Sequence, residues 1–407
     1  MRSADGSVRL AVTGIGIRCA IGNDQHEVWA SIVAARDGIG TLDMFPGETF
    51  PTDIAAQADL ERFVPAGFSR SEAKRLSRTD LFAIVAAGEC WAQANAAGSA
   101  IAPEGVVVSS GTSTGGLLEG EEFFMRRERL GARRAAASAV LQQPTSAPSD
   151  AVARHLGLGG GVFSNATACA SGGAAIGFAA DLIRSGQASA AIAGGSDALC
   201  RLTYSGFNVL QAVDPKPCRP FDAARQGITL GEGAAYIMVE RWDDAVARGA
   251  EILAELCGYG ASCDASHPTA PAEDGRGARA AMLGAIHDGG ADGERIDYVN
   301  AHGTGTLLND SAETKAIVAA VGADVPVSST KSYFGHTLGA AGGLEAVIAV
   351  LALRHQIAPP TLRLETPAAD CTLDYIPKTP RPLAMQRVLS NTFGFGGSNV
   401  SLLFRAV

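Results

Sequence analysis

The chain has 407 residues, of which 47% are hydrophobic, so it is long enough to bury a sizeable core in one or two domains. Its formal net charge of −9 at pH 7 argues against a general nucleic-acid-binding protein, although it is compatible with a local basic patch. We expect no membrane span, because we find no uninterrupted apolar run of transmembrane length.

The eight cysteines include no C-x-x-C pair with zinc spacing, and no signal-peptide pattern opens the sequence. Disulfides belong to oxidising compartments, so we expect free thiols, a cytoplasmic setting and no metal site. Each cysteine therefore has to be judged by its sequence context.

Apolar strands and amphipathic helices alternate along the first part of the chain. Buried strands next to glycine turns are predicted at 8–15, 105–110, 188–194 and 233–240. Helices are predicted at 24–35, capped by Asn23 or Asp24, and at 77–97, capped by Ser77 or Thr79. The polar, arginine-rich segment 123–148 has the character of an insertion over the core.

The same alternation returns in the second part of the chain. Strands are predicted at 251–259, 296–300, 325–329, 388–393 and 400–404. Helices are predicted between them at 275–288, 309–321 and 339–355.

The two parts share the same order of predicted strands, loops and helices, which predicts a duplicated unit. A strand followed by a glycine-rich loop at 105–116 recurs at 296–306, and a strand, loop and small-residue helix at 162–184 recurs at 325–355. This order predicts an α/β sandwich with largely parallel sheets, divided into halves 1–250 and 251–407.

Cys169 stands at the predicted turn that opens a helix within 165–184. Unpaired backbone N–H groups and the helix dipole favour negative charge there, so we expect this thiol to ionise more readily than a free cysteine. Cys90 and Cys257 lie in apolar runs, which raise a thiol pKa. The alternative is that Cys169 is a buried structural cysteine.

Three further motifs carry groups suited to catalysis. They read Asn300-Ala-His302-Gly-Thr304-Gly-Thr306, Lys331-Ser-Tyr-Phe-Gly-His336, and Ser390-Asn-Thr-Phe-Gly-Phe395-Gly-Gly-Ser-Asn399. Each histidine alone could be structural. One cysteine and two histidines at matching strand ends indicate instead a catalytic site.

This combination resembles the elongating β-ketoacyl-acyl-carrier-protein synthases and type II polyketide ketosynthases of the thiolase superfamily, which use a Cys-His-His set. The resemblance runs from Val12-Thr-Gly-Ile-Gly to Asn399 and includes Pro220-Phe-Asp and Leu230-Gly-Glu-Gly. It implies a thiolase-like duplicated αβαβα five-layer sandwich with cap insertions. The second cysteine of the biosynthetic thiolases is absent from the last glycine-rich turn, and His336 stands where the initiating synthases have Asn.

The resemblance implies a role for each site residue. Cys169 would be the nucleophile that takes the acyl group from a pantetheine thioester, and His302 and His336 would support decarboxylation of malonyl-acyl carrier protein. The N–H groups of Cys169 and Phe395 would form the oxyanion hole. Lys331 and Glu345 would order the site as a supporting pair.

It also implies how the substrate is held. Thr304 and Thr306 would hydrogen-bond the pantetheine arm, with help from Thr269. Phe395 would gate the acyl tunnel, and Thr114 would stand at its floor. The 4′-phosphopantetheine arrives on the carrier protein, so no resident cofactor is expected.

The implied partners are an acyl carrier protein and a second ketosynthase-like subunit, in a homodimer or a heterodimer. The carrier proteins of this family are acidic, which predicts a basic docking patch. Two candidate clusters are Arg70, Lys74, Arg75 and Arg78, and Arg126, Arg127 and Arg129. The alternative for each cluster is an ordinary solvated face.

Some positions depart from the fatty-acid enzymes. Gly305 is common in polyketide synthases, and Thr114 replaces an apolar floor residue with a hydroxyl that needs a partner. Gln142 and Gln143 are polar near the expected dimer interface. Fatty-acid and polyketide or polyene substrates therefore stay open as rivals. The alternative from another functional class is a non-catalytic subunit that shapes a tunnel in a heterodimer. The intact Cys-His-His set argues against this alternative.

Overall fold

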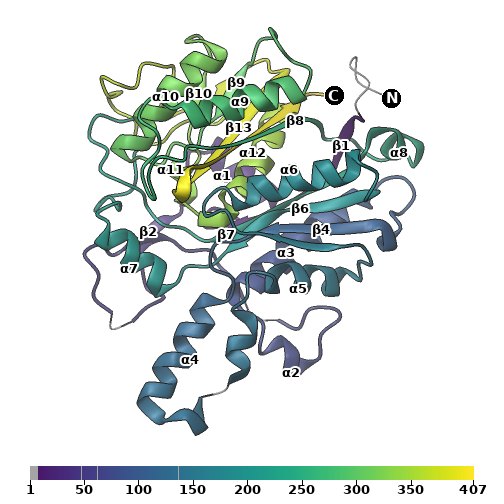
Figure 1. Cartoon of the computed structure of the whole chain (residues 1–407), viewed down its shortest axis with the longest axis vertical. Helices are drawn as coiled ribbons and strands as arrows, with labels where there is room; N and C mark the ends of the chain where they lie inside the picture. The colour runs from purple at the N-terminus through teal and green to yellow at the C-terminus, as the bar shows by residue number, and fades with distance from the viewer. Residues whose placement is uncertain (1–7, 47, 62, 136) are drawn as a thin grey trace.

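The computed structural model describes residues 8–46, 48–61, 63–135 and 137–407 (Figure 1). Two groups of five strands dominate it. The first group is β1 (Leu10–Cys19), β4 (Val106–Gly111), β5 (Val162–Asn165), β6 (Ala190–Asp197) and β7 (Gly233–Arg241). The second is β8 (Ala254–Cys263), β9 (Tyr298–Asn300), β10 (Val327–Ser328), β13 (Arg387–Gly394) and β14 (Ser398–Arg405).

The strand order shows that the two groups share one topology. The first group runs β1-β7-β6-β4-β5 and the second β8-β14-β13-β9-β10. Each therefore places its first strand at one edge, with its fifth, fourth, second and third strands following. In both groups the second strand pairs in parallel with its neighbours, and the last strand pairs antiparallel. The repeated order of elements in the sequence thus corresponds to a repeated sheet topology.

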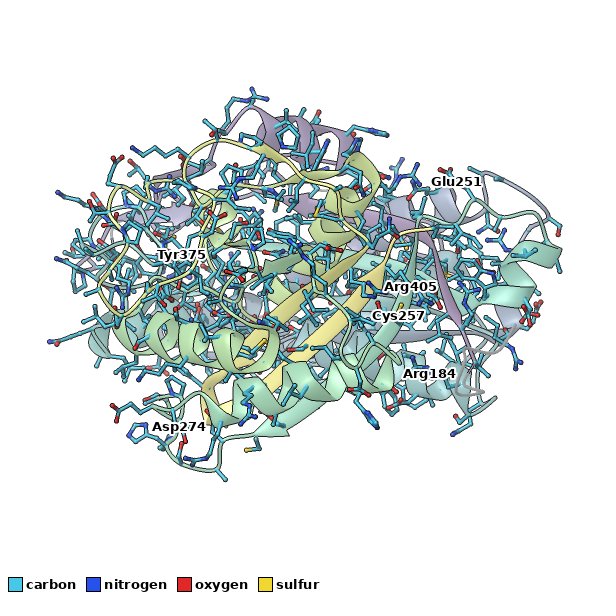
Figure 2. The ribbon with its side chains drawn as sticks, turned by 90° about the horizontal axis from the view of Figure 1, so that it is seen from above. Arg184, Glu251, Cys257, Asp274, Tyr375 and Arg405 are labelled. Carbon is cyan, nitrogen blue, oxygen red and sulfur yellow. The ribbon has the colours of Figure 1, made fainter. Side chains whose placement is uncertain are left out.

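The two sheets meet edge to edge where Ala11 and Val12 of β1 pair with β8. Beside this seam the Glu255 carboxylate accepts from Arg9 Nε at 2.8 Å and from Arg405 Nη2 at 2.7 Å. Figure 2 shows Arg405 and Cys257 close together, as the pairing of β14 with β8 requires. These charged contacts fasten the N-terminal strand to the second half.

The longer helices form three layers around the sheets. Between the sheets lie α6 (Ser171–Arg184) and α12 (Ala341–His355). The outer face of the first sheet is covered by α3 (Arg78–Ala94) and α5 (Ala147–Leu156), and that of the second by α9 (Arg276–Asp288) and α10 (Leu307–Val321) (Figure 1). The result is the five-layer αβαβα arrangement.

The remaining elements are short or peripheral. Helices α4 (Leu117–Leu130) and α7 (Arg201–Val209) project from the layers in Figure 1. The others are α1 (Gln25–Val33), α2 (Arg70–Ala73), α8 (Trp242–Ala247), α11 (Lys331–Phe334), β2 (Ile39–Thr41), β3 (Ile54–Ala56), β11 (Ile357–Ala358) and β12 (Arg381–Pro382).

The glycine- and alanine-rich composition explains the central layer. A Cβ on Gly172 of α6 would lie 2.9 Å from Gly339 O and from Gly343 N, which precede and begin α12. A Cβ on Gly177 would lie 2.2 Å from the Tyr259 ring of β8. The two helices therefore approach each other and the sheets at distances that side chains forbid.

The structure corrects three sequence expectations about elements. The insertion expected at 123–148 contains the end of α4, which begins at Leu117, then short 3₁₀ turns at Ala132–Arg134 and Ala137–Gln142 and the start of α5; neither α5 nor α7 was predicted. The sequence of α7 is only nine residues long and carries Gly206 and two β-branched residues, Thr203 and Val209, all of which have low helix propensity. The segment Leu338–His355 does have the length and hydropathy of a membrane span, but 89% of it is buried inside the fold.

Candidate active site

Cys169 lies in a tight turn between β5 and α6. The preceding residue, Ala168, has φ +49°, a left-handed conformation that a side chain disfavours. Two hydroxyls hold its carbonyl, because Ser113 Oγ donates to Ala168 O at 3.0 Å and Ser171 Oγ donates at 2.6 Å. The turn is thereby fixed, and it presents the Cys169 side chain, 5% exposed, just before α6 begins.

The thiol of Cys169 is not the easily ionised group that the sequence suggested. Burial raises its pKa to about 12, although the Lys331 charge and the Phe395 backbone N–H act to lower it. Burial also raises the pKa of Cys257 to about 12 and that of Cys90 well above the ordinary value. The helix start does not outweigh desolvation here, so the resting residue is a thiol.

His302 follows β9 and is held both through its backbone and through one nitrogen of its ring. Its backbone N–H and that of Gly303 donate to the Glu313 carboxylate at 2.8 and 2.7 Å. Lys331 Nζ lies 3.1 Å from His302 Nδ1 and can only donate, so the proton of the neutral ring is assigned to Nε2. Burial, with the nearby Lys331 charge, holds the pKa of His302 well below 6.5.

His336 lies between α11 and α12, and its ring faces that of His302. The ring centroids are 5.3 Å apart and the planes meet at 85°. The backbone fixes the residue, because His336 N donates to Thr229 O at 2.7 Å and Gly231 N donates to His336 O at 3.0 Å. Within the described residues Nδ1 is buried without a hydrogen-bond partner. Burial also holds the pKa of His336 well below 6.5.

Lys331 and Glu345 form a buried ion pair behind the histidines. Lys331 Nζ contacts Glu345 Oε1, and the two side chains are 1% and 0% exposed. Thr392 Oγ1 donates to the other carboxylate oxygen at 3.2 Å. Burial raises the pKa of Glu345 to about 7. The pair ties α11, α12 and β13 together and holds the ammonium against His302.

The glycine-rich turn between β13 and β14 packs directly on the cysteine turn. A Cβ on Gly394 would lie 3.1 Å from Cys169 N and 3.0 Å from Thr167 O. The N–H groups of Phe395 and Cys169 both act to lower the pKa of the Cys169 thiol, so both are directed at its sulfur. The Phe395 ring lies 5.4 Å from that of Phe207 on α7.

A cavity of about 370 Å³ opens in front of these groups. It brings together seven residues singled out from the sequence: Cys169, Thr269, His302, Thr304, Thr306, His336 and Phe395. Lys331 and Glu345 stand outside its lining, and Lys331 reaches the site through its contact with His302 Nδ1. Leu210, Leu307 and Leu308 lie at the rim, and each is more than half exposed.

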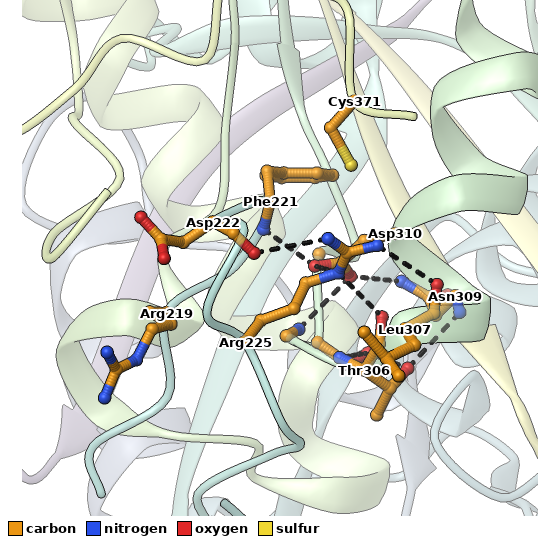
Figure 3. A network of polar contacts seen from close by, with 12 residues as sticks. Arg219, Phe221, Asp222, Arg225, Thr306, Leu307, Asn309, Asp310 and Cys371 are labelled. Carbon is orange, nitrogen blue, oxygen red and sulfur yellow. Dashed lines mark hydrogen bonds and ion pairs between the residues drawn. The ribbon is translucent and has the colours of Figure 1, made fainter. Parts of the chain in front are cut away.

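The threonine turn on one side of the cavity has its own buried support (Figure 3). Thr304 Oγ1 and Thr306 Oγ1 lie 2.9 Å apart, and Gly305 N donates to Asp310 at 3.1 Å. Arg225, 3% exposed, pairs with Asp310 and donates to Thr306 O at 3.4 Å. Gly305 has φ +84°, which only glycine adopts readily.

The resemblance placed Thr114 at the floor of the acyl tunnel, but in the structure its side chain is bonded to a buried carboxylate. Its hydroxyl donates to Asp197 Oδ1 at 2.7 Å, so it has a buried partner rather than an open acyl space. Among the described residues that line the cavity, Thr114 is not included. The partner that the Thr114 hydroxyl was expected to need is Asp197 on β6, 83 positions away in the sequence, so local patterns could not identify it.

The basic clusters separate into exposed and internal residues. Arg78 pairs with the fully buried Glu232 at 2.6 Å and donates to Ala58 O, so it is a structural residue rather than a docking one. The other arginines and the lysine are exposed: Arg70, Lys74, Arg75, Arg126, Arg127 and Arg129.

Sequence reasoning missed residues that shape the site without touching its centre. Glu313 holds the backbone of the His302 loop, and Phe207 packs on Phe395. Glu313 follows the His302 motif on the predicted helix, which was a usable signal. Phe207 gave none, because its helix was not predicted. All eight cysteines are free, and Cys263 is the exposed one.

Comparisons with known proteins show the family to which the chain belongs. The family models for the N-terminal and C-terminal domains of beta-ketoacyl synthase match residues 8–245 and 253–365. The 3-oxoacyl-[acyl-carrier-protein] synthase 2 of Synechocystis sp. (strain ATCC 27184 / PCC 6803 / Kazusa) is 38% identical over 98% of both chains.

Two solved structures have the same fold. The ishigamide ketosynthase/chain length factor is 32% identical, with a TM-score of 0.93, over 98% of this chain and 100% of that one. A type II polyketide ketosynthase in complex with its acyl-carrier protein is 28% identical, with a TM-score of 0.89, over the same shares. The chain therefore belongs to the β-ketoacyl synthase family.

Proposed function

We propose that the chain condenses an acyl group with malonyl-acyl carrier protein to give β-ketoacyl-acyl carrier protein and carbon dioxide. One observation carries the proposal: a cysteine, two neutral histidines and two inward N–H groups meet in one cavity. Two-step covalent catalysis needs such a nucleophile, an oxyanion site and a desolvated pocket.

The first step transfers the acyl group to Cys169. The sulfur attacks the thioester carbonyl, and the oxygen that gains charge accepts from the N–H groups of Cys169 and Phe395. A new carbon–sulfur bond forms, and the bond to the pantetheine sulfur breaks. The proton that leaves Cys169 ends on the released pantetheine thiol. Thr269, Thr304 and Thr306 hold the pantetheine arm.

The second step breaks the carbon–carbon bond to the malonyl carboxylate and releases carbon dioxide. The electrons form an enolate whose oxygen accepts the Nε2–H of His302 and an N–H of His336. The enolate carbon attacks the acyl-Cys169 carbonyl, a carbon–carbon bond forms, and the Cys169 sulfur leaves and takes up a proton. Lys331 and Glu345 keep His302 in the required tautomer.

The partners follow from the comparisons. The similar polyketide ketosynthase was solved with its acyl-carrier protein, and the ishigamide protein pairs a ketosynthase with a chain length factor. This chain accepts acyl groups from a carrier protein that brings its own 4′-phosphopantetheine, and it works as a homodimer or heterodimer in the cytoplasm. Arg126 and Arg127 on α4 and the exposed residues around α2 offer the basic surface. Fatty-acid and polyketide or polyene chains are both compatible with this chemistry.

The test compares the wild type with Cys169→Gln in the presence of acyl- and malonyl-carrier proteins. Gln fills the space of an acylated thiol and leaves both histidines in place. We expect the variant to lose β-ketoacyl product entirely while it still releases carbon dioxide from malonyl-carrier protein. No product from the wild type, alone or with a partner subunit, would favour the non-catalytic scaffold.

A further inference from the structure

A single buried carboxylate connects the two turns that carry Cys169 and His336. Asp197 ends β6 and is 0% exposed. Its Oδ2 accepts from Ser113 N at 2.8 Å and from Gly339 N at 2.7 Å. Its Oδ1 accepts from Thr112 Oγ1, Thr114 N and Thr114 Oγ1 at 2.6, 3.0 and 2.7 Å.

Through Ser113, the Asp197 carboxylate is connected to the turn that carries Cys169; we call Asp197 and its hydrogen-bond donors the hub. Ser113, whose N–H is held by Asp197, donates its hydroxyl to Ala168 O, next to Cys169 and at the strained φ of +49°. The carboxylate is therefore bonded to the loop that supports the turn of Cys169.

Through Gly339, the hub is connected to the turn that carries His336. Gly339 follows His336 by three residues and opens the approach to α12. A Cβ on Gly339 would lie 2.6 Å from Ser113 N and 2.7 Å from Asp197 Oδ2. The backbone of the second half is thus pressed onto the loop of the first half, with the carboxylate between them.

We propose that Asp197 is a positioning residue for the condensation: by binding both loops at once, it fixes the Cys169 sulfur relative to the His336 imidazole. The inference rests on the proposed function, since it concerns the same two groups. In the condensation step the enolate that His336 helps to hold attacks the acyl group on Cys169, and a misplacement of about 1 Å between such reacting groups can cost about a hundredfold in rate.

The chemistry of the hub defines an informative substitution. Each carboxylate oxygen accepts at least one backbone N–H, so Asp197→Asn must turn its NH₂ group toward a donor in either orientation. The matched control is Asp222→Asn. Asp222 is also buried and also accepts backbone N–H groups on both oxygens, from Ala224, Glu365 and Thr366. None of its donors belongs to the Cys169 or His336 turns.

The experiment measures kcat, KM and melting temperature for the wild type and both variants, with carrier-bound substrates and well below the melting temperatures. We expect both variants to lose stability, and only Asp197→Asn to lose about tenfold or more in kcat, with KM nearly unchanged. Equal kcat in the two folded variants would overturn the proposal and leave Asp197 a purely structural residue.

A second variant keeps the proposal testable if Asp197→Asn does not fold. Ser113→Ala removes the hydroxyl that supports Ala168 and keeps the N–H that Asp197 binds. We expect it to slow acylation of Cys169 several-fold and to leave malonyl decarboxylation unchanged. An unchanged acylation rate would contradict the link from the hub to Cys169. Failure of the wild type to acylate Cys169 would instead reject the proposed function.

Discussion

At the scale of single residues, the site depends on burial that keeps its acid–base groups neutral. The pKa of Cys169 is raised and those of both histidines are lowered by the same desolvation. A neutral imidazole can donate an N–H to an enolate oxygen, and the buried Lys331–Glu345 pair fixes which nitrogen of His302 carries the proton. The histidines are thus set for hydrogen-bond donation rather than for charge.

This arrangement predicts that His302 and His336 act on one intermediate. Each of His302→Ala and His336→Ala is expected to slow malonyl decarboxylation about a hundredfold or more. The double variant should be scarcely slower than either single one, because each deletion already leaves the enolate without its paired donors. The rates are measured as carbon dioxide release, and His287→Ala, on the exposed end of α9, is the matched control.

A pH series is a second readout for the histidines. Both pKa values lie well below 6.5, so both rings stay neutral when the pH falls through that value. The histidines should therefore contribute no titration of decarboxylation near the ordinary histidine pKa of about 6.5. Because burial raises the pKa of Glu345 to about 7, the series is run on Glu345→Gln as well as on the wild type. Two independent defects that multiply in the double variant, or a titration near pH 6.5 that persists in Glu345→Gln, would contradict the shared role.

At the scale of elements, the site is made by two turns that nearly touch. The turn after β13 lies against the one before α6 because Gly394 has no side chain. The same turn supplies the Phe395 N–H that is directed at the Cys169 sulfur. The oxyanion site that we propose therefore depends on backbone approach between two halves of the chain.

We expect Gly394→Ala to displace this contact. Its Cβ would meet backbone atoms of Thr167, Cys169 and Ala170 at 3.0 to 3.1 Å, and neither turn can yield by a rotamer change. The acylation rate of Cys169 should fall about tenfold or more. Gly40→Ala is the control, because nothing lies within 4 Å of its added Cβ. A normal acylation rate in folded Gly394→Ala would show that the approach is not required.

At the scale of the whole molecule, the duplicated sheet brings the nucleophile from the first half to both histidines from the second. Much of this could be predicted from the sequence. The strands are apolar runs with glycine turns, and Cys169, His302 and His336 follow strand ends in a repeated order, which local patterns reveal.

What could not be predicted depends on distant partners. The pKa of Cys169 follows from burial by the full packing, which outweighs the local helix start. Arg78 was predicted to be a surface charge because its buried partner, Glu232, is 154 positions away in the sequence. The Thr114 hydroxyl is likewise satisfied by Asp197 from another strand. Helix α7 was not predicted because it is short and carries Gly206 and two β-branched residues, which lower its helix propensity.

The most direct test of the account is to locate the acyl group after the protein is mixed with an acyl-carrier thioester, by mass spectrometry of the digested chain. The acyl donor is a better probe than an alkylating reagent, because the exposed Cys263 reacts with the latter whatever the mechanism. We predict one acylated residue, Cys169, whose adduct is unchanged in Cys263→Ser and absent in Cys169→Ser. Condensation that proceeds with no adduct on Cys169, or with an adduct on another residue, would contradict the account.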